Sequence, residues 1–229
     1  MLRRHVLPAV VSVLTLAATR PAAAQSAALR PAEAARAVRS LLQQGVQAAI
    51  DELGQADGFW SRPRVRIGLP PYLDDAATVL RSTGQRQRLD ELHRALNRAA
   101  EAAVPLGREL LLQTVQRISV DDALALLRGG DTAVTAFFER RTREPLTQRF
   151  KPVVQRATEQ VGLARQYDAV AGRAERMGLL RPGEGSVAEY VTARTLDGLF
   201  ATVAEHERRL RDNPADAATS LLRRALQLR

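Results

Sequence analysis

"PAEAARAVRSLLQQGVQAAIDELG", residues 31 to 54, decides the fold class of this chain. Its apolar residues recur at every third or fourth position, which places them on one face of an α-helix. That face comprises Val38, Leu41, Leu42, Val46, Ala49, Ile50 and Leu53. Pro31 suits the first turn of a helix, and Gly54 commonly follows the last one. The stretch therefore predicts a helix that begins near Pro31 and stops at Gly54.

The same spacing runs through most of the remaining chain. It predicts a short helix from Leu73 that Gly84 closes. A longer helix begins near Leu89, and Pro105 should kink or split it before the pattern continues to Ile118. We expect an all-α fold, a bundle of about seven to nine helices that forms one domain over residues 31 to 229.

Three short motifs mark where later helices begin. "SVDD" at 119 to 122 and "SVAE" at 186 to 189 each place a serine three residues before an acid. The serine hydroxyl can then cap the helix while the acid bonds back to the cap. "NPAD" at 213 to 216 places an asparagine at the cap position and a proline at the first helical position.

One Pro/Gly-rich segment, "GQADGFWSRPRVRIGLPPYL" at 54 to 73, breaks the helical pattern. Its glycines and prolines, and its alternating apolar residues, favour extended backbone over about residues 54 to 71. A lone extended segment leaves backbone groups unpaired. We therefore expect it to run along the helices or to form a small hairpin, with Phe59 and Trp60 pointing inward.

The first 24 residues have the layout of a cleavable secretory signal. A basic start precedes an apolar stretch at 6 to 18, and Ala22 and Ala24 are the small residues before the expected cut after Ala24. The apolar stretch is shorter than the roughly 20 residues that a transmembrane helix needs. We expect export, a flexible N-terminus over residues 25 to 30, and no transmembrane span. The chain has no cysteine, so it can form no disulfide.

The charge of the chain does not indicate a nucleic-acid partner. The formal net charge is +9, and three arginines of the expected signal, which has no acid, contribute to it, so the rest of the chain carries +6. Basic and acidic residues alternate closely, as in "LDELHRALNRAAE" at 89 to 101. This pattern is typical of a solvated surface of mixed charge.

Several classes of enzyme lose their usual signatures. Beyond the expected signal only His93 and His206 are histidines, and neither belongs to a cluster with metal-ligand spacing. A cysteine nucleophile is impossible, and no G-x-S-x-G, P-loop or G-x-G-x-x-G motif occurs. We therefore expect no metal and no cofactor, and the sequence leans away from catalysis.

Two sets of carboxylates remain as weak catalytic candidates. Asn97, Arg98 and Glu101 can meet on one side of a helix, where the surrounding alanines allow another helix to approach. A buried polar network that sets helix register is the favoured interpretation, before an exposed ion pair and before a catalytic carboxylate. Asp121 and Asp122 are helix neighbours that point about 100° apart, so capping and the helix dipole explain them better than shared acid–base chemistry.

The helix predicted from "SVAE" contains two further signals. Glu207 and Arg211 are four residues apart, a favourable spacing for an ion pair on a helix. Gly198 lies within the helix, where glycine costs about 1 kcal/mol relative to alanine. Such a glycine indicates that a packing partner or a ligand approaches the backbone closely.

The motifs together resemble a bacterial family, the domain of unknown function number 4197. The resemblance covers roughly residues 35 to 228 and lies in the following stretches: "LGQADGFW", "VRIGLPPYL", "LNRAAEAAVP", "SVDDALALLRGGDTAVTAFFERRT", "FKPVV" and "YVTARTLDGLFATVAEHERRLRDNPA". It implies an exported helical protein of the cell envelope and assigns no activity, cofactor or catalytic residue. Some members look lipid-anchored, whereas this chain has no cysteine after its signal, which favours a soluble periplasmic protein.

Two functional hypotheses follow. The first is a non-catalytic periplasmic protein that binds an apolar small molecule between its helices or another envelope component, with segment 58 to 72 beside the ligand. Its candidate contact residues are Phe59, Trp60, Tyr72, Asn97 and Tyr190. The second is a hydrolase or lyase that uses Glu101 with Arg98, or Asp121 with Asp122.

Overall fold

The computed structural model describes residues 29–179 and 186–227. The expected signal peptide lies outside these ranges. Within them the chain forms nine α-helices, two short 3-10 helices and no β-strand, which confirms the all-α prediction. The elements are α1 (Pro31–Leu53), η1 (Pro71–Leu73), α2 (Asp74–Ser82), α3 (Arg86–Leu106), α4 (Arg108–Arg117), α5 (Ala123–Arg128), α6 (Ala133–Gln160), α7 (Leu163–Arg176), α8 (Val187–Asp212), η2 (Pro214–Asp216) and α9 (Ser220–Leu226).

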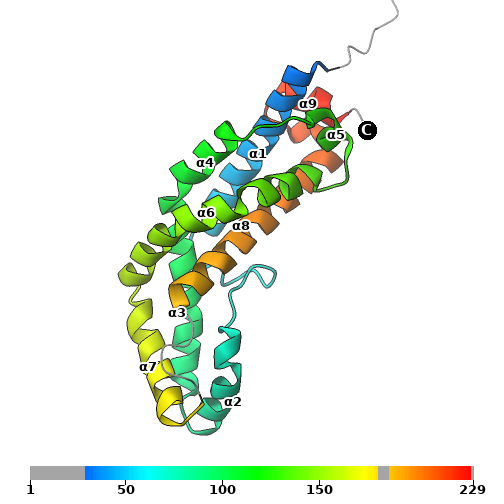
Figure 1. Cartoon of the computed structure of the whole chain (residues 1–229). Helices are drawn as coiled ribbons and strands as arrows, with labels where there is room; N and C mark the ends of the chain where they lie inside the picture. The colour runs from blue at the N-terminus through cyan, green and yellow to red at the C-terminus, as the bar shows by residue number, and fades with distance from the viewer. Residues whose placement is uncertain (1–28, 180–185, 228–229) are drawn as a thin grey trace, which may run out of the picture.

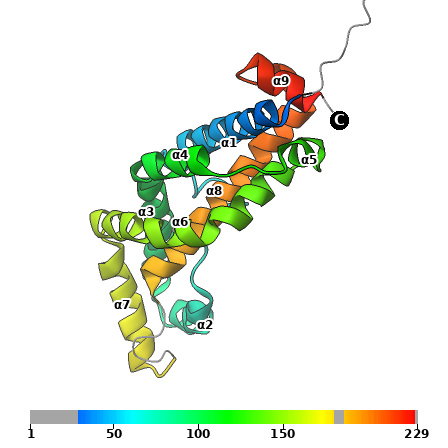
Figure 2. The ribbon, with the colours of Figure 1, turned by 45° about the horizontal axis from the view of Figure 1, so that its top comes forward.

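The helices form an elongated bundle (Figure 1). At one end α1, α6 and α8 pack against one another, with α4 and α5 beside α1 and with α9 near the start of α1. Helix α3 contacts α6 and α8 and then runs to the other end, where α7 and α2 pack on it. The second view shows the same arrangement (Figure 2), with α4 lying alongside the middle of α6. Helix α3 therefore joins the two ends of the bundle.

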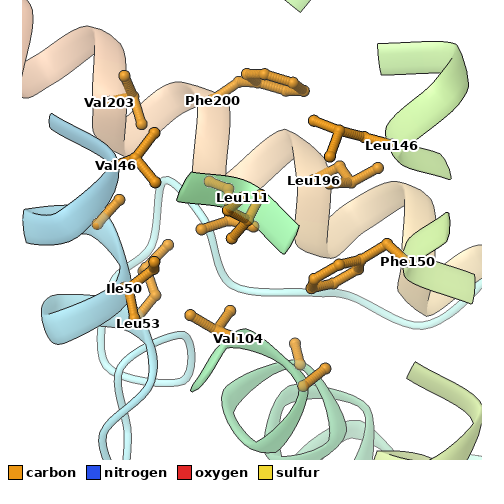
Figure 3. Packing of buried hydrophobic residues seen from close by; sticks show 14 of the residues in the cluster. Val46, Ile50, Leu53, Val104, Leu111, Leu146, Phe150, Leu196, Phe200 and Val203 are labelled. Carbon is orange, nitrogen blue, oxygen red and sulfur yellow. The ribbon is translucent and has the colours of Figure 1, made fainter. Parts of the chain in front are cut away.

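The core lies where α1, α3, α4, α6 and α8 meet (Figure 3). The seven apolar residues predicted for one face of α1 are all buried. Val46, Ile50 and Leu53 from this face point toward Val203 of α8 and Val104 of α3. Burial of one such side chain typically stabilises the fold by about 1.5–3 kcal/mol, so this shared core accounts for much of the helix packing.

The helix is interrupted between α3 and α4, as Pro105 predicts. Pro105 lies in the last turn of α3, and Gly107 ends α3 and begins α4. A Cβ atom on Gly107 would lie 2.1 Å from Cε2 of Phe150, which is fully buried in α6. Glycine at 107 therefore allows α6 to approach the junction closely.

The three predicted capping motifs have different outcomes. The Ser186 side chain accepts a hydrogen bond from the Glu189 N–H (3.3 Å), so the cap of α8 is confirmed. The cap by Ser119 is wrong, because α5 begins only at Ala123 and the Ser119 hydroxyl donates to Asp121 instead (2.9 Å). Asn213 precedes a 3-10 helix, and its side chain bonds Asp216 rather than the backbone. Hydroxyl caps compete with other local acceptors, and sequence spacing does not decide that competition.

The Glu207–Arg211 pair of α8 is buried, and it holds the α5–α6 junction. Glu207 accepts hydrogen bonds from the N–H groups of Val134 and Thr135 at the start of α6 (3.1 and 2.7 Å). Arg211 bonds Glu207 (2.7 Å) and donates to the carbonyl groups of residues 126 and 127 at the end of α5. One ion pair therefore satisfies a helix start and a helix end, which have no partners within their own helices.

The segment at 54 to 71 is non-helical, as predicted, up to the start of η1, but only part of it is extended. Successive turns fold its first half, with the Gly58 N–H bonded to Gln55 O (3.0 Å) and the Arg62 N–H to Phe59 O (3.2 Å). Residues 66–70 are the longest run of the segment with neither turn nor helix, and no hairpin forms in the described chain. Local turns satisfy backbone groups that an isolated extended segment would leave unpaired.

No helix among the described residues is both long and apolar enough to cross a membrane.

Candidate functional site

The Asn97 side chain of α3 bonds the backbone of the extended residues 66–70. Its side-chain oxygen accepts from the Ile67 N–H (2.9 Å), and its side-chain nitrogen donates to the Ile67 carbonyl (2.8 Å). The same nitrogen donates to the His93 carbonyl (2.9 Å). Asn97 is fully buried and makes the two bonds that a neighbouring β-strand would otherwise supply.

Glu101, one helical turn further, holds the turns of the same segment. Its Oε1 atom accepts from the N–H groups of Phe59 (3.1 Å) and Trp60 (3.2 Å). Its Oε2 atom accepts from Arg98 (2.7 Å), whose other terminal nitrogen bonds Asp57 (2.8 Å). The hydrogen bond to Glu101 raises the pKa of Arg98 above its usual value. Only 4% of Glu101 is exposed, and both of its carboxylate oxygens accept hydrogen bonds from within the protein.

Asp57 explains why this network is placed at the turns. It has a φ of 63°, the only positive φ of a non-glycine residue in the described ranges. Aspartate tolerates this left-handed conformation better than most residues, but the conformation still costs free energy. The bond from Arg98 holds Asp57 in that conformation, and Glu101 then bonds the backbone that follows.

Phe59 and Trp60 have different environments. Phe59 is fully buried against Gly198 of α8, where a Cβ atom would lie 2.6 Å from Cε1 of the ring. The close approach expected at Gly198 is therefore confirmed, and its partner is Phe59. Trp60 is half-buried, with its ring edge-on to His93 (4.9 Å between centroids) and with the Arg66 and Arg94 guanidinium groups 5.0 Å from its centre.

Tyr72 and Tyr190 lie at the other end of the segment. The Tyr190 hydroxyl, near the start of α8, lies within bonding distance of the carbonyl oxygens of Gly68 (3.2 Å) and Leu69 (3.3 Å). Tyr72 belongs to η1, and burial, followed by the neighbouring Tyr167 phenol, raises its pKa above the usual range. The structure thus brings the predicted contact residues together along one segment, where Asn97, Phe59 and Tyr190 attach it to α3 and α8.

Asp121 and Asp122 lie in the exposed turn before α5. Asp121 accepts from the Ser119 hydroxyl (2.9 Å), and no described bond joins either aspartate to Glu101 or Arg98. Across the described ranges, no group of three or more histidine, aspartate or glutamate residues is placed to hold a metal ion. The two predicted carboxylate sets therefore do not form one site.

A groove between α4 and α6 contains the cationic groups that the sequence did not single out. Its volume is about 350 Å³, and it lies between the end of α4, residues 118–119 and the middle of α6. It is lined by Thr114, Arg117, Ile118, Ser119, Arg141, Thr142, Pro145, Leu146 and Arg149. A second, more open hollow of about 700 Å³ continues along α6, and Arg149 lines both.

The three arginines of this groove, Arg117, Arg141 and Arg149, have no acidic partner in the described part of the chain. By contrast Arg143, on another face of α6, bonds both Glu139 (2.6 Å) and Asp197 (2.8 Å). Like charges that lie close together without acids favour the binding of an anion.

Hydroxyl groups and apolar side chains complete the groove. Thr114 and Thr142 donate their protons to carbonyl oxygens of their own helices (2.7 and 2.6 Å), so the arginines remain the hydrogen-bond donors. Leu146 and Ile118 are buried apolar residues of the lining. Arg39 of α1 donates to the Ile118 carbonyl (3.1 Å) and so fixes the chain at that end. No sequence signal marked this site, because its arginines come from two helices and each belongs to an ordinary mixed-charge stretch.

The comparisons with known proteins concern the family and not the activity. No curated protein and no solved structure matches the chain. The family described as protein of unknown function (DUF4197) matches residues 28–226, which is nearly the whole described chain and agrees with the resemblance in the motifs. The chain therefore belongs to the DUF4197 family.

Proposed function

We propose that this protein is an exported periplasmic protein that acts without catalysis, by binding an anionic ligand in the groove between α4 and α6. The observation that carries the proposal is the set of three arginines without acidic partners around a hollow of about 350 Å³. Ligand sites are typically hollows of roughly 300–1,000 Å³ with apolar walls and a few polar groups that fix the ligand. This groove has both features.

The expected export signal supports the cellular part of the proposal. It rests on the basic, apolar and small-residue order of residues 1–24, which lie outside the described ranges. The absence of cysteine from the sequence leaves no residue for a thioether lipid anchor. Together these features favour a soluble protein of the periplasm.

The geometry of Glu101 argues against the enzymatic alternative. A general acid or base needs an oxygen within reach of a substrate proton. Both oxygens of Glu101 are engaged by Arg98 and by the N–H groups of Phe59 and Trp60, and the residue is buried. Asp121 and Asp122 are exposed, and neither lines one of the two hollows beside α6.

Contacts within the protein also change the role of the predicted apolar site. The Phe59 ring packs against Gly198, and the Asn97 side chain bonds the Ile67 backbone. Segment 58 to 72 is therefore packed onto α3 and α8, and the hollows beside α6 are lined by other residues. The apolar ligand of the first hypothesis becomes, in this proposal, a ligand with a negative charge.

Native mass spectrometry of protein purified gently from its own cell envelope tests the proposal. We expect an additional mass that denaturant removes, present in the wild type and lost in Arg149→Glu. The matched control is Arg140→Glu, which makes the same charge change on the exposed, opposite side of α6 and should retain the mass. A wild-type protein without extra mass, and with a melting temperature that envelope extract does not change, would contradict the proposal and direct attention to protein partners.

A further inference from the structure

We infer that the ligand of this groove is an amphiphile in which a phosphate group is joined to a single hydrocarbon chain. The inference rests on the proposed function and specifies the ligand class. Arg117, Arg141 and Arg149 hold the phosphate in the first hollow, and the chain follows α6 into the second hollow.

The charge of the first hollow favours phosphate over carboxylate. Three guanidinium groups line the first hollow, and no acidic side chain does. Asp121 is close in sequence and accepts a hydrogen bond from Ser119, but it is not part of the lining. A phosphate monoester carries about −1.5 to −2 charges near neutral pH and has three acceptor oxygens. A carboxylate carries only one charge, so it would neutralise less of the charge of the three arginines than a phosphate monoester does. The planar fork of arginine also matches the spacing of phosphate oxygens.

The apolar walls indicate a hydrocarbon chain attached to that phosphate. Pro145, Ile118 and Leu146 line the first hollow, and Leu110, Pro152 and Val153 line the second. Pro145 and Pro152 lie within α6, where each deprives the helix of an N–H donor and presents ring carbons to the hollow. Inorganic phosphate would leave this surface in water, whereas a chain removes it from water at a gain of about 0.8 kcal/mol per buried methylene group.

Arg149 connects the two requirements, because it lines both hollows. Its guanidinium can bond the phosphate while its aliphatic stem contacts the beginning of the chain. The far hollow also contains Gln155, Arg156 and Glu159, which are polar. The hydrocarbon chain of the ligand would therefore lie between the arginines of the first hollow and the polar residues at the far end of the second. This arrangement fits a ligand with one hydrocarbon chain and one charged end.

The lining argues against a nucleic acid as the source of the phosphate. Neither hollow is lined by an aromatic side chain. Proteins that bind single-stranded nucleic acids stack the bases on aromatic rings, each worth about 1–3 kcal/mol. The two hollows therefore offer arginines to a phosphate group but no aromatic ring on which a nucleic-acid base could stack.

Isothermal titration of the purified protein with dodecyl phosphate, below its micelle concentration, tests the inference. Inorganic phosphate lacks the chain, dodecyl maltoside lacks the charge, and laurate replaces phosphate by carboxylate. We expect dodecyl phosphate to bind about tenfold or more tightly than each of the three, because only it combines a phosphate in the first hollow with a hydrocarbon chain in the second. Equal affinity for dodecyl phosphate and inorganic phosphate, or for dodecyl phosphate and laurate, would overturn the inference.

Three variants identify the groups involved. Arg149→Gln should weaken dodecyl phosphate about tenfold or more, because a bond to a charged group is lost. Leu110→Gln should weaken dodecyl phosphate and leave inorganic phosphate unchanged. Arg140→Gln is the control and should bind like the wild type, and circular dichroism melts check that all three variants fold. An Arg149→Gln variant that binds dodecyl phosphate like the wild type would also overturn the inference.

Two further results separate the possible sources and the two proposals. Arg149-dependent sedimentation with vesicles that contain lysophosphatidic acid, a phosphate monoester with a single acyl chain, identifies a membrane lipid as the source, and binding of the dispersed amphiphile alone identifies a soluble one. If dodecyl phosphate fails while envelope-purified protein still carries an Arg149-dependent mass, the ligand class is wrong and the binding function stands. If both fail, the binding function is wrong as well.

Discussion

At the residue scale, buried carboxylates in this protein bond backbone N–H groups and arginine. Glu101 bonds two N–H groups of segment 54 to 71, and Glu207 bonds two at the start of α6. Each also pairs with an arginine on its own helix, Arg98 or Arg211. A buried ion of this kind is costly to disrupt, because removal of one partner leaves the others in the interior without bonds.

Glu101→Ala should therefore lower the free energy of unfolding by about 1–3 kcal/mol. The substitution leaves the N–H groups of Phe59 and Trp60 without an acceptor and frees Arg98 from its buried partner. Urea denaturation monitored by Trp60 fluorescence measures the loss. Asp121→Ala, which removes an exposed carboxylate, is the control and should change stability by less than about 0.5 kcal/mol. An unchanged midpoint for Glu101→Ala would mean that the network contributes nothing net and would reopen a functional role for this carboxylate.

At the element scale, segment 54 to 71 is positioned by helices that are distant in sequence. Helix α3 supplies its polar partners, through Asn97 and Glu101. Helix α8 supplies the packing surface for Phe59 at Gly198 and a hydroxyl from Tyr190. Hydrogen bonds from these three polar side chains, together with the space that Gly198 leaves for Phe59, therefore replace the strand partner that the segment lacks.

Gly198→Ala tests this packing between elements. In an exposed helix the change would stabilise by about 1 kcal/mol through helix propensity. Here the new Cβ atom would lie 2.6 Å from the buried Phe59 ring, so we expect a net destabilisation of about 1–3 kcal/mol. Gly172→Ala is the matched control, because its Cβ would meet only the end of the Arg176 side chain at 3.6 Å in α7. Phe59→Leu combined with Gly198→Ala should cost less than the sum of the two single changes, as a double-mutant cycle would show.

At the scale of the whole molecule, charged side chains link α1, near the start of the chain, with α8, near its end. Glu52 of α1 lies 2.7 Å from His206 of α8 and also contacts Arg209 and Arg62. Burial opposes its charge, but His206, Arg209 and Arg62 together lower the pKa of Glu52. Burial, followed by the charge of Arg209, lowers the pKa of His206, and burial also lowers the pKa of His93.

These shifts predict a loss of stability in mild acid. A histidine whose pKa is lower in the folded state takes up its proton more readily in the unfolded state. The free energy of unfolding should therefore be highest above about pH 6.5, the unfolded value, and should fall as the pH decreases toward the lower folded values. Urea titrations between pH 8 and pH 5 measure this slope. His93→Gln and His206→Gln should each flatten it, and a double variant that retains the full wild-type slope would contradict the assignment.

Much of the fold follows from the sequence by itself. Apolar spacing determined that residues 31 to 53 form a helix with a buried face, and Pro105 determined where the long helix α3 ends. Gly198 indicated a close approach within α8, because glycine in a helix is unfavourable unless something occupies the space of a side chain. These inferences succeed because they depend on neighbours within one or two helical turns.

The partners of these groups were decided by the tertiary structure. Spacing brought Asn97, Arg98 and Glu101 to one side of a helix, but it could not show that their partners are backbone groups of residues 59, 60 and 67. It placed Glu207 beside Arg211, but not inside the α5–α6 junction. The arginines of the groove became a site only when α4 packed alongside α6. The physical reason is that local periodicity determines which face of a helix is apolar, whereas the position of one helix on another depends on contacts between residues far apart in the chain.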